Sequence, residues 1–508
     1  MLKTITQKIL SGHRVTPKNS QKEKLDALRS EMVKENIDAF IVPRVDIYQG
    51  EFVAPHAERL AWLTGFTGSA GVAAILKNEA AVLTDGRYTI QLSQQVDSSL
   101  YKLENIVKIS SAKWISERLG DNGVIGYDPW LHTPKQIEMM EALLQEKSIR
   151  IKPLKDNLVD RIWKERPHAP AEKAEIFPES AAGSSAAQKK ENIHQNLKDK
   201  KIFASVINMP DSLAWLLNVR GRDIASTPVV LSLGIVYGEQ RPVKWFVDSA
   251  KLTPEVARHI GNSVEVLAPG LIEKQIDELA AEAKKAGLPI GLDFMHAPVW
   301  FKQRLEAAGA KVVNFKDPCI LPKAIKTPEE RESIRMAHVT DGVAVTKFLC
   351  WLDEEGSKGK LTELDVVDKF EAIRQEDKTY KGPSFDTISG WAANGAIVHY
   401  RAVEETNKKI AGPGILLVDS GGQYHWGTTD ITRTVAIGTP TEEMKKNFTL
   451  VLKGHIAVAR AHFPEGTNGA QVDASVKLRL NTLARSFYPS EMILSLQFLT
   501  DRKKGEVL

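Results

Sequence analysis

An internal repeat in the first 320 or so residues is the strongest constraint on how this chain can fold. The tetrapeptide LAWL occurs twice, each time after an apolar, strand-like run, and other similar segments follow it in the same order. The matching pairs are RLAWLTGF (59–66) with SLAWLLNV (212–219), AVLTDGRY (81–88) with KWFVDSAK (244–251), and VIGYD (124–128) with PIGLD (289–293). Chance can supply one such match but hardly three in order, so the region contains two copies of one unit.

Helix-like and strand-like segments alternate within each copy. Stretches such as SQKEKLDALRSEMVKEN and IEKQIDELAAEAKKAG have helical patterning and are separated from the next by short apolar runs. This alternation is typical of α/β domains, in which helices pack on a sheet. A chain of 508 residues is also well beyond the size of one hydrophobic core. We therefore expect one α/β domain over residues 1–160, a second over 161–324, and a third domain after them.

The third domain opens with a helix-start signal in KAIKTPEERESIRMAHV. Thr327 can cap the helix, Pro328 suits its first position, and Glu330 stands three residues after the cap, which is the spacing of a capping box. We expect this domain to begin at residue 325.

Composition excludes several classes of protein. Lys and Arg number 68 against 64 Asp and Glu, and the basic residues are scattered, so we expect neither nucleic acid nor a membrane as partner. No eighteen apolar residues run together, and MLKTITQKILSGHR at the start has no signal-peptide core. Only two cysteines, Cys319 and Cys350, are present, which fits a reducing compartment. These features predict a cytoplasmic protein.

Two aspartates, Asp419 and Asp430, lie eleven positions apart in GILLVDSGGQYHWGTTDITRT. We expect a hairpin with one strand over 415–418, a turn over 420–427 and a returning strand over 428–437. Such pairing would bring the two carboxylates together, and a divalent cation between them would relieve their repulsion. Oxygen ligands of this kind suit Mg, Ca or Mn. The alternative is that Asp419 only initiates the DSGG turn while Asp430 lies on the solvated face of an edge strand.

His399 is a candidate for proton transfer. It ends an apolar run in ANGAIVHYRA, within a segment over 384–403 that we expect to contain strands. A histidine near an activated water can move protons or stabilise an oxyanion. The alternative is a half-buried histidine whose hydrogen bonds serve only the fold.

Three segments in this order and spacing resemble the catalytic domain of the Xaa-Pro aminopeptidases (aminopeptidase P): SFDTISGWAANGAIVHYRA, LLVDSGGQYHWGTTDITRT and FPEGTNGAQVD. The upstream FTGSAGVAAILKNEAAVLTDGRY resembles their first amino-terminal domain, and the repeat over 201–293 resembles their second. The resemblance runs from about residue 20 to Asp473. It favours this family over the neighbouring prolidases and creatinases, and implies two creatinase-type α/β domains followed by a pita-bread α+β domain.

The resemblance also implies a chemistry. Members of the family remove the first residue of peptides whose second residue is proline, use two divalent ions, usually manganese, and generally act as homodimers. By this resemblance Asp419 would bind one ion through both oxygens, Asp430 would bridge both ions, and His399 would contact the substrate and stabilise the reaction centre. Two ions would lower the pKa of a water between them and polarise the scissile carbonyl.

The chain departs from the family pattern after Asp473. The family's HGTGHGVG-like segment and two later metal-binding glutamates have no counterpart in residues 474–508, which resemble no family segment. We therefore expect a truncated pita-bread domain over 325–473 with an incomplete metal site and an aberrant tail over 474–508. This predicts weak metal binding and little or no peptidase activity. Two alternatives remain open, a non-catalytic pita-bread protein that binds peptides or partners, and a non-functional gene fragment.

Overall fold

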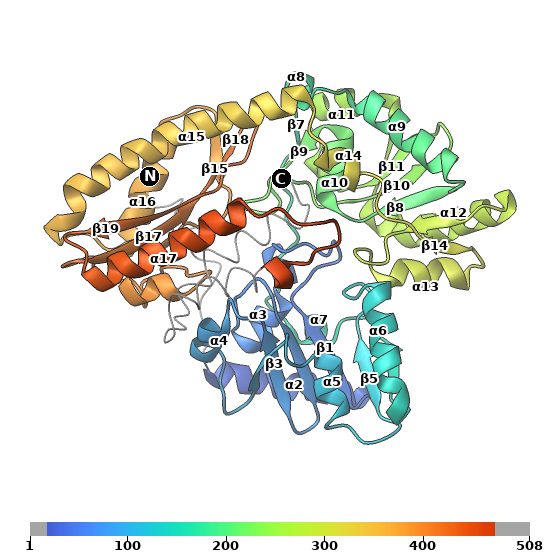
Figure 1. Cartoon of the computed structure of the whole chain (residues 1–508). Helices are drawn as coiled ribbons and strands as arrows, with labels where there is room; N and C mark the ends of the chain where they lie inside the picture. The colour runs from blue at the N-terminus through green and yellow to red at the C-terminus, as the bar shows by residue number, and fades with distance from the viewer. Residues whose placement is uncertain (1–17, 473–508) are drawn as a thin grey trace. The chain divides into compact units, whose positions relative to one another are not determined.

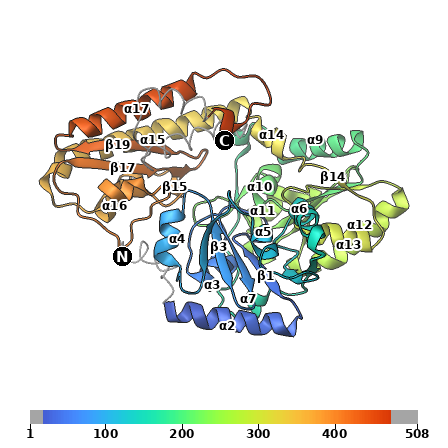
Figure 2. The ribbon, with the colours of Figure 1, turned by 60° about the horizontal axis from the view of Figure 1, so that its bottom comes forward.

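The computed structural model describes residues 18–472, and the chain divides into two compact units, Met1–Lys323 and Ala324–Leu508. The predicted aberrant tail, 474–508, lies outside the described residues. Figures 1 and 2 show both units as ribbons, with sheets covered by helices in each. Among the helices of the described part, none is long and apolar enough to cross a membrane.

The first unit contains two six-stranded sheets of the same design. Their orders are β4-β3-β2-β1-β5-β6 and β12-β11-β10-β8-β13-β14. In each sheet, the three strands that come first in the sequence form an antiparallel group, β1–β2–β3 in one sheet and β8–β10–β11 in the other. The remaining three strands of each sheet join this group through parallel pairing. The strands of the first sheet are β1 (Ala39–Pro43), β2 (Val72–Leu76), β3 (Ala80–Thr84), β4 (Lys102–Asn105), β5 (Val124–Tyr127) and β6 (Arg150–Pro153). Those of the second are β8 (Ala204–Ile207), β10 (Leu233–Tyr237), β11 (Val243–Phe246), β12 (Val264–Leu267), β13 (Ile290–Leu292) and β14 (Val312–Asn314).

The internal repeat read from the sequence is confirmed by these sheets. The two LAWL segments form α3 (Arg59–Thr64) and α10 (Pro210–Leu217), and each helix follows the first strand of its sheet. The later matched segments fall on β3 and β11 and on β5 and β13, which hold equivalent places in the two orders. The other α-helices and strands described in this unit are α2 (Lys18–Lys34), α4 (Thr89–Gln95), α5 (Ser111–Ser116), α6 (Pro134–Leu144), α7 (Leu158–Ile162), β7 (Glu175–Ile176), α8 (Glu179–Ala182), α9 (Ala186–Asp199), β9 (Val219–Arg220), α11 (Pro254–Ile260), α12 (Ile272–Ala286), α13 (Val299–Ala307) and α14 (Ile320–Ala324), whose last residue belongs to the second unit.

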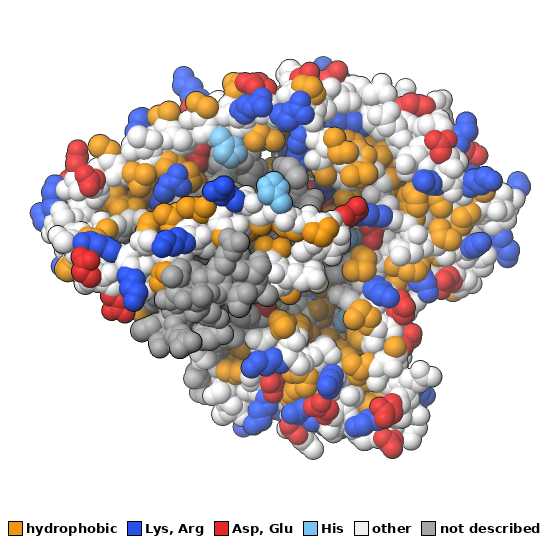
Figure 3. Space-filling model, viewed as in Figure 1, with side chains coloured by type: hydrophobic (Ala, Val, Ile, Leu, Met, Phe, Trp, Pro, Cys, Tyr) orange, Lys and Arg blue, Asp and Glu red, His pale blue; other side chains and the backbone are white. Residues whose placement is uncertain are grey.

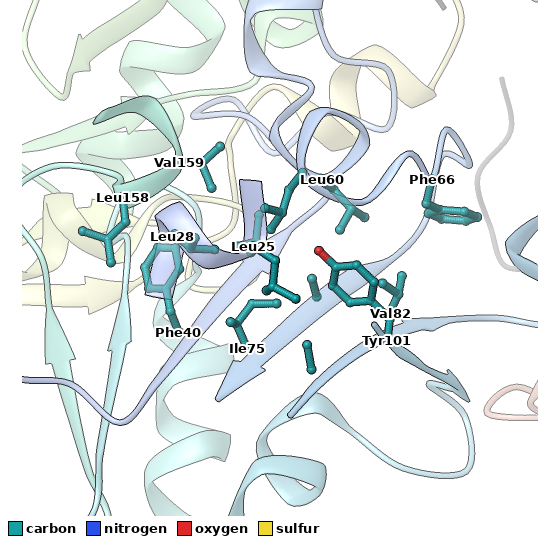
Figure 4. Close-up of a cluster of buried hydrophobic side chains, with 14 of the residues drawn as sticks. Leu25, Leu28, Phe40, Leu60, Phe66, Ile75, Val82, Tyr101, Leu158 and Val159 are labelled. Atoms are coloured by element: carbon teal, nitrogen blue, oxygen red, sulfur yellow. The ribbon is translucent and has the colours of Figure 1, made fainter. Parts of the chain in front are cut away.

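One helix shows how sequence pattern and packing agree in the first sheet. Leu25, Leu28 and Met32 lie on one face of α2, and each is at most 1% exposed. Figure 4 shows Leu25 and Leu28 beside Phe40 and Ile75, which come from the sheet. Burying side chains of this size contributes about 1.5 to 3 kcal/mol each. The amphipathic helix is therefore fixed by the apolar face of the sheet that it covers.

The second unit begins with the long helix α15 (Pro328–Glu355), and its predicted start is confirmed. The Glu330 amide donates to Thr327 Oγ1 over 3.1 Å, and the Thr327 amide donates to Glu330 Oε2 over 2.9 Å. This capping box satisfies amide groups that a helix start leaves without intrahelical partners.

A three-stranded antiparallel sheet, β16-β17-β19, lies beneath α15 and α16 (Glu363–Arg374). The helices pack on one face, where the rings of Phe348 and Phe370 stack with centroids 4.2 Å apart. Leu416 and Val418 supply the sheet's side of this core. The strands are β16 (Ile388–Trp391), β17 (Gly414–Ser420) and β19 (Ile431–Ile437).

The hairpin predicted around the aspartates forms, but its connection is more elaborate than a turn. β17 extends through Ser420, and Gly422–Tyr424 forms a further strand, β18, within the segment predicted as turn. β18 pairs antiparallel with β15 (Tyr380–Pro383) in a separate two-stranded sheet. The rings of Tyr380 and Tyr424 pack edge to face across this pair. A long-range pairing partner, which local turn chemistry does not reveal, explains the difference.

The strand prediction over 384–403 is correct only for β16. The 3-10 helix η7 (Ala392–Ala396) follows, and His399 lies in a turn rather than at the end of a strand. A side-chain partner holds the chain where β16 ends, because the Trp391 amide and the Asn394 side chain both donate to the carboxylate of Glu363.

The long helix α17 (Glu442–Ala459) follows β19. Three apolar side chains at four-residue spacing, Phe448, Leu452 and Ile456, are each at least 45% exposed. Figure 3 shows hydrophobic side chains running along this helix. Only Gly454 and Val458 of α17 are buried, so little of the helix is packed against the described residues.

The stacked phenylalanines predict where the second unit is vulnerable. Phe348→Ala should lower the free energy of unfolding by about 3 to 5 kcal/mol, because it leaves a cavity between α15, α16 and the sheet. Val343→Ala on the same helix, where the side chain is 55% exposed, should change it by no more than about 0.5 kcal/mol. Urea unfolding followed by circular dichroism measures both. Equal effects of the two variants would show that the stack does not support this core.

Candidate metal centre

The alternation of side chains along β17 separates the apolar core from the candidate site. Leu416 and Val418 face the helices, and Ser420 also does, since its hydroxyl accepts a hydrogen bond from Arg374 of α16. Neighbouring side chains in a strand point to opposite faces. Asp419 therefore lies on the face of the sheet turned away from α15 and α16.

The strand register brings Asp430 to the same face. Asp419 pairs with Thr432 and Ser420 with Ile431, and Asp430 directly precedes β19. Because Thr432 lies opposite Asp419, Asp430 two residues earlier is on that face as well. The two carboxylates are close enough to interact electrostatically. The structure thus brings together the two aspartates that the sequence singled out.

Asp419 is buried without compensation. It is 1% exposed, and neither of its carboxylate oxygens has a hydrogen-bond partner. Burial, with a smaller contribution from the Asp430 carboxylate, raises the pKa of Asp419 to about 7, although the nearby Thr432 hydroxyl and Ser420 amide oppose the shift. An Asp419 that initiated the DSGG turn would accept hydrogen bonds from turn amides, so the geometry does not support that alternative.

This donor set fits a hard divalent cation. Buried carboxylate oxygens normally have hydrogen-bond partners, and a cation beside the pair would supply the missing interaction and remove the repulsion. Carboxylate oxygens suit Mg, Ca and Mn. Within residues 18–472, no group of three or more His, Cys, Asp or Glu side chains converges to hold a metal. Asp419 and Asp430 are accordingly the donors that the described part offers at this place.

A buried ion pair beside the aspartates was not found from the sequence. Asp341 of α15 and Arg374 of α16 are 2% and 1% exposed, and Arg374 Nε donates to Asp341 Oδ1 over 2.7 Å. Arg374 also donates to the Ser420 hydroxyl and to the Gly421 carbonyl. Asp341 occupies the buried face of α15 between Ala337 and Phe348. A charged residue at an apolar helical position is the signal that could have identified this pair.

A second buried carboxylate organises the segment that carries His399. Glu363 is 0% exposed and accepts hydrogen bonds from the Trp391 and Lys408 amides, the Asn394 side chain and the Tyr400 hydroxyl. These contacts fix the chain on both sides of His399, which is half-buried in its turn. The structure explains how the segment is held, and the role of His399 at the aspartate pair stays a prediction.

Three family models match the chain. A Creatinase/Prolidase N-terminal domain matches residues 24–162 and again 165–330, and Metallopeptidase family M24 matches 332–492. Among curated proteins, the probable Xaa-Pro aminopeptidase P of Aspergillus niger is 38% identical over 466 residues, covering 89% of this chain and 74% of that protein. The chain belongs to the Xaa-Pro aminopeptidase family. It is therefore a hydrolase of the M24 metallopeptidases by descent.

Other relatives support the assignment of this chain to the Xaa-Pro aminopeptidase family. The probable Xaa-Pro aminopeptidase P of Paracoccidioides brasiliensis is 37% identical over 477 residues, covering 92% of this chain and 76% of that protein. The solved X-prolyl aminopeptidase of Caenorhabditis elegans, described as a cytosolic enzyme with a di-nuclear active site, is 32% identical with a TM-score of 0.85, covering 91% of this chain and 77% of that one. These matches confirm the predicted fold class, two creatinase-type α/β domains followed by a pita-bread α+β domain.

Gly421, between the strand that ends after Asp419 and the segment leading to Asp430, predicts a local effect of substitution. A Cβ at this position would overlap with the Thr429 carbonyl oxygen and the Ser384 hydroxyl. Gly421→Ala should cost about 1 to 3 kcal/mol of stability by overpacking and should weaken Mn²⁺ binding, because the segment between the aspartates must shift.

Gly342→Ala is the matched control, since a Cβ at this position of α15 meets nothing within 4 Å. It should raise stability by up to about 1 kcal/mol, as alanine favours a helix over glycine. Thermal unfolding and Mn²⁺ titration test both variants. Unchanged Mn²⁺ affinity in Gly421→Ala would show that the close approach of this backbone does not support the site.

Proposed function

We propose that this chain is a metal-dependent aminopeptidase that removes the first residue from peptides with proline at the second position. The observation that carries the proposal is the pair of buried Asp419 oxygens without partners, beside Asp430, in a member of the Xaa-Pro aminopeptidase family. We further propose two divalent ions, manganese by preference, and a cytoplasmic homodimer. The di-nuclear site and cytosolic description of the C. elegans enzyme support the ion count and the location.

In this proposal each side chain has one task. Asp419 and Asp430 hold the cations through their carboxylate oxygens. Bound divalent ions supply Lewis-acid activation of water and of the scissile carbonyl. His399 donates a hydrogen bond to the substrate near the reacting carbonyl and carries a proton at its imidazole ring. The Glu363 contacts to Trp391, Asn394 and Lys408 keep the His399 segment in place during this work.

The preference for proline has a physical basis in the peptide bond. A bond to proline lacks an N–H group and has a restricted shape, so a site that binds extended peptides through backbone hydrogen bonds cannot use it well. An enzyme that relies on cations to bind and polarise the carbonyl does not need that N–H group. The imide bond is therefore a suitable substrate for such a centre.

The strength of metal binding is a separate part of the proposal. Each ion of such a centre takes about four to six donors, and the described residues offer two carboxylates at this place. We expect Mn²⁺ to bind weakly and turnover to be low for the chain as it stands. A role as a non-catalytic peptide-binding protein is the second candidate, and it predicts peptide binding that does not depend on Asp419.

Substitution of Asp419 tests the proposal. With Mn²⁺ supplied, the wild-type chain should cleave a peptide with proline at position two and not the matched peptide with alanine there. Asp419→Ala should lower both Mn²⁺ affinity and turnover. The decrease should exceed the about 10- to 100-fold that is typical when a residue that hydrogen-bonds to a metal ligand is removed. EDTA should abolish cleavage in the wild type.

Asp353→Asn, at an exposed position of α15, is the control and should change neither quantity. Cleavage that survives both EDTA and Asp419→Ala would contradict the proposal. Peptide binding without any Mn²⁺ binding would favour the non-catalytic candidate.

A further inference from the structure

The segment between the two aspartates is anchored at both ends to one buried ion pair. Ser420 and Gly421 follow Asp419 directly, and Thr429 precedes Asp430 directly. Each of these three residues has a hydrogen bond to Asp341 or Arg374. The pair thus contacts the immediate chain neighbours of both carboxylates.

Arg374 anchors the Asp419 end. One guanidinium nitrogen, Nη1, donates to the Ser420 hydroxyl and to the Gly421 carbonyl oxygen, the latter over 3.2 Å. The other two nitrogens donate to Asp341, over 2.7 Å from Nε and 3.2 Å from Nη2. The guanidinium also stacks on the ring of Phe370, 4.0 Å from its centroid. Its planar array of donors is therefore fully engaged in one orientation.

Asp341 anchors the Asp430 end. Its Oδ2 accepts from the Thr429 hydroxyl over 2.8 Å, and its Oδ1 accepts from the Tyr424 hydroxyl over 2.8 Å. The Thr429 hydroxyl in turn accepts from the Gly422 amide over 2.9 Å, which ties the two limbs of the connection to each other. Thr429 and Tyr424 are both buried, so these contacts are shielded from water.

We propose that Asp341 and Arg374 are positioning residues, which set the separation of Asp419 and Asp430 and thereby set how tightly the centre retains a divalent ion. The inference rests on the proposed metal site. These two side chains would affect metal affinity through their contacts with the neighbours of Asp419 and Asp430, without touching the ion.

A role in stability alone would not require this arrangement. Buried ion pairs are poor stabilisers, because desolvation of the charges offsets their attraction, and well-packed apolar residues often replace them without loss. The Asp341–Arg374 pair instead uses its remaining hydrogen-bonding capacity on residues 420, 421 and 429. Hydrogen-bonding partners that orient metal ligands typically alter affinity by about 10- to 100-fold when removed.

The test compares two buried aspartates of similar surroundings. Asp341→Asn keeps the shape of the side chain but sets an amide against the guanidinium of Arg374. Asp223→Asn is the matched control, since Asp223 of the first unit is also buried in an ion pair, 2.6 Å from Lys251 Nζ. Free Mn²⁺ is counted by electron paramagnetic resonance during titration, and thermal unfolding is recorded for each variant.

Asp341→Asn should raise the Mn²⁺ dissociation constant by about tenfold or more, whereas Asp223→Asn should destabilise its unit and leave Mn²⁺ binding unchanged. A second pair of variants avoids the ion pair itself. Thr429→Val removes the hydroxyl that binds Asp341 and should weaken Mn²⁺ binding, while Thr429→Ser keeps the hydroxyl and should restore wild-type affinity.

Each outcome decides the question. Equal Mn²⁺ affinity in Asp341→Asn and wild type, or equal losses in Asp341→Asn and Asp223→Asn, would overturn the positioning role while leaving the proposed metal site intact. Wild-type protein that binds Mn²⁺ no better than Asp419→Ala would instead overturn the metal site, and the positioning role with it. An equal loss of Mn²⁺ affinity in Thr429→Val and Thr429→Ser would also contradict a role for the hydrogen bond from the Thr429 hydroxyl to Asp341.

Discussion

The desolvation of Asp419 is the constraint on which the second unit depends. A carboxylate at 1% exposure with no hydrogen-bond partner is expensive to bury, and the fold accepts this cost at the end of the central strand of its sheet. The apolar face of that strand, packed under α15 and α16, holds the backbone in place. Packing on the helix side therefore holds β17 in place, while Asp419 on its opposite face has no hydrogen-bond partner.

Three buried acids in this unit differ in how many hydrogen bonds the chain gives them. Glu363 has donors from four residues, and Asp341 has an arginine and two hydroxyl groups around it. Asp419 has none. The first two carboxylates have all their hydrogen-bond partners within the chain and need no bound ligand. The third has no such partner, which is the pattern expected of a ligand position.

The sequence predicted those features that depend on short-range signals. The capping box joins Thr327 to Glu330, three residues later, and the repeated segments of the first unit keep recognisable local sequence, so both are predictable from the sequence. The face shared by Asp419 and Asp430 follows from period-two alternation. Long-range partners were not predictable in this way, because β18 pairs with β15 and Trp391 binds Glu363 across dozens of residues. The role of Arg374 was not predictable for the same reason, because it depends on hydrogen bonds to residues 420 and 421, which are far away in the sequence.

The equivalent strand orders of the two N-terminal sheets carry a consequence for how the chain folds. In each sheet the outer strands join in parallel through crossover connections, which close slowly, so both sheets expose unpaired edges while they assemble. Tandem domains of one design are prone to exchange such strands with each other. In these copies, little sequence is shared beyond LAWL and a few aligned positions, although the topology is the same. Because the two copies share a strand order but few residues, we expect sequence divergence to reduce the exchange of strands between them.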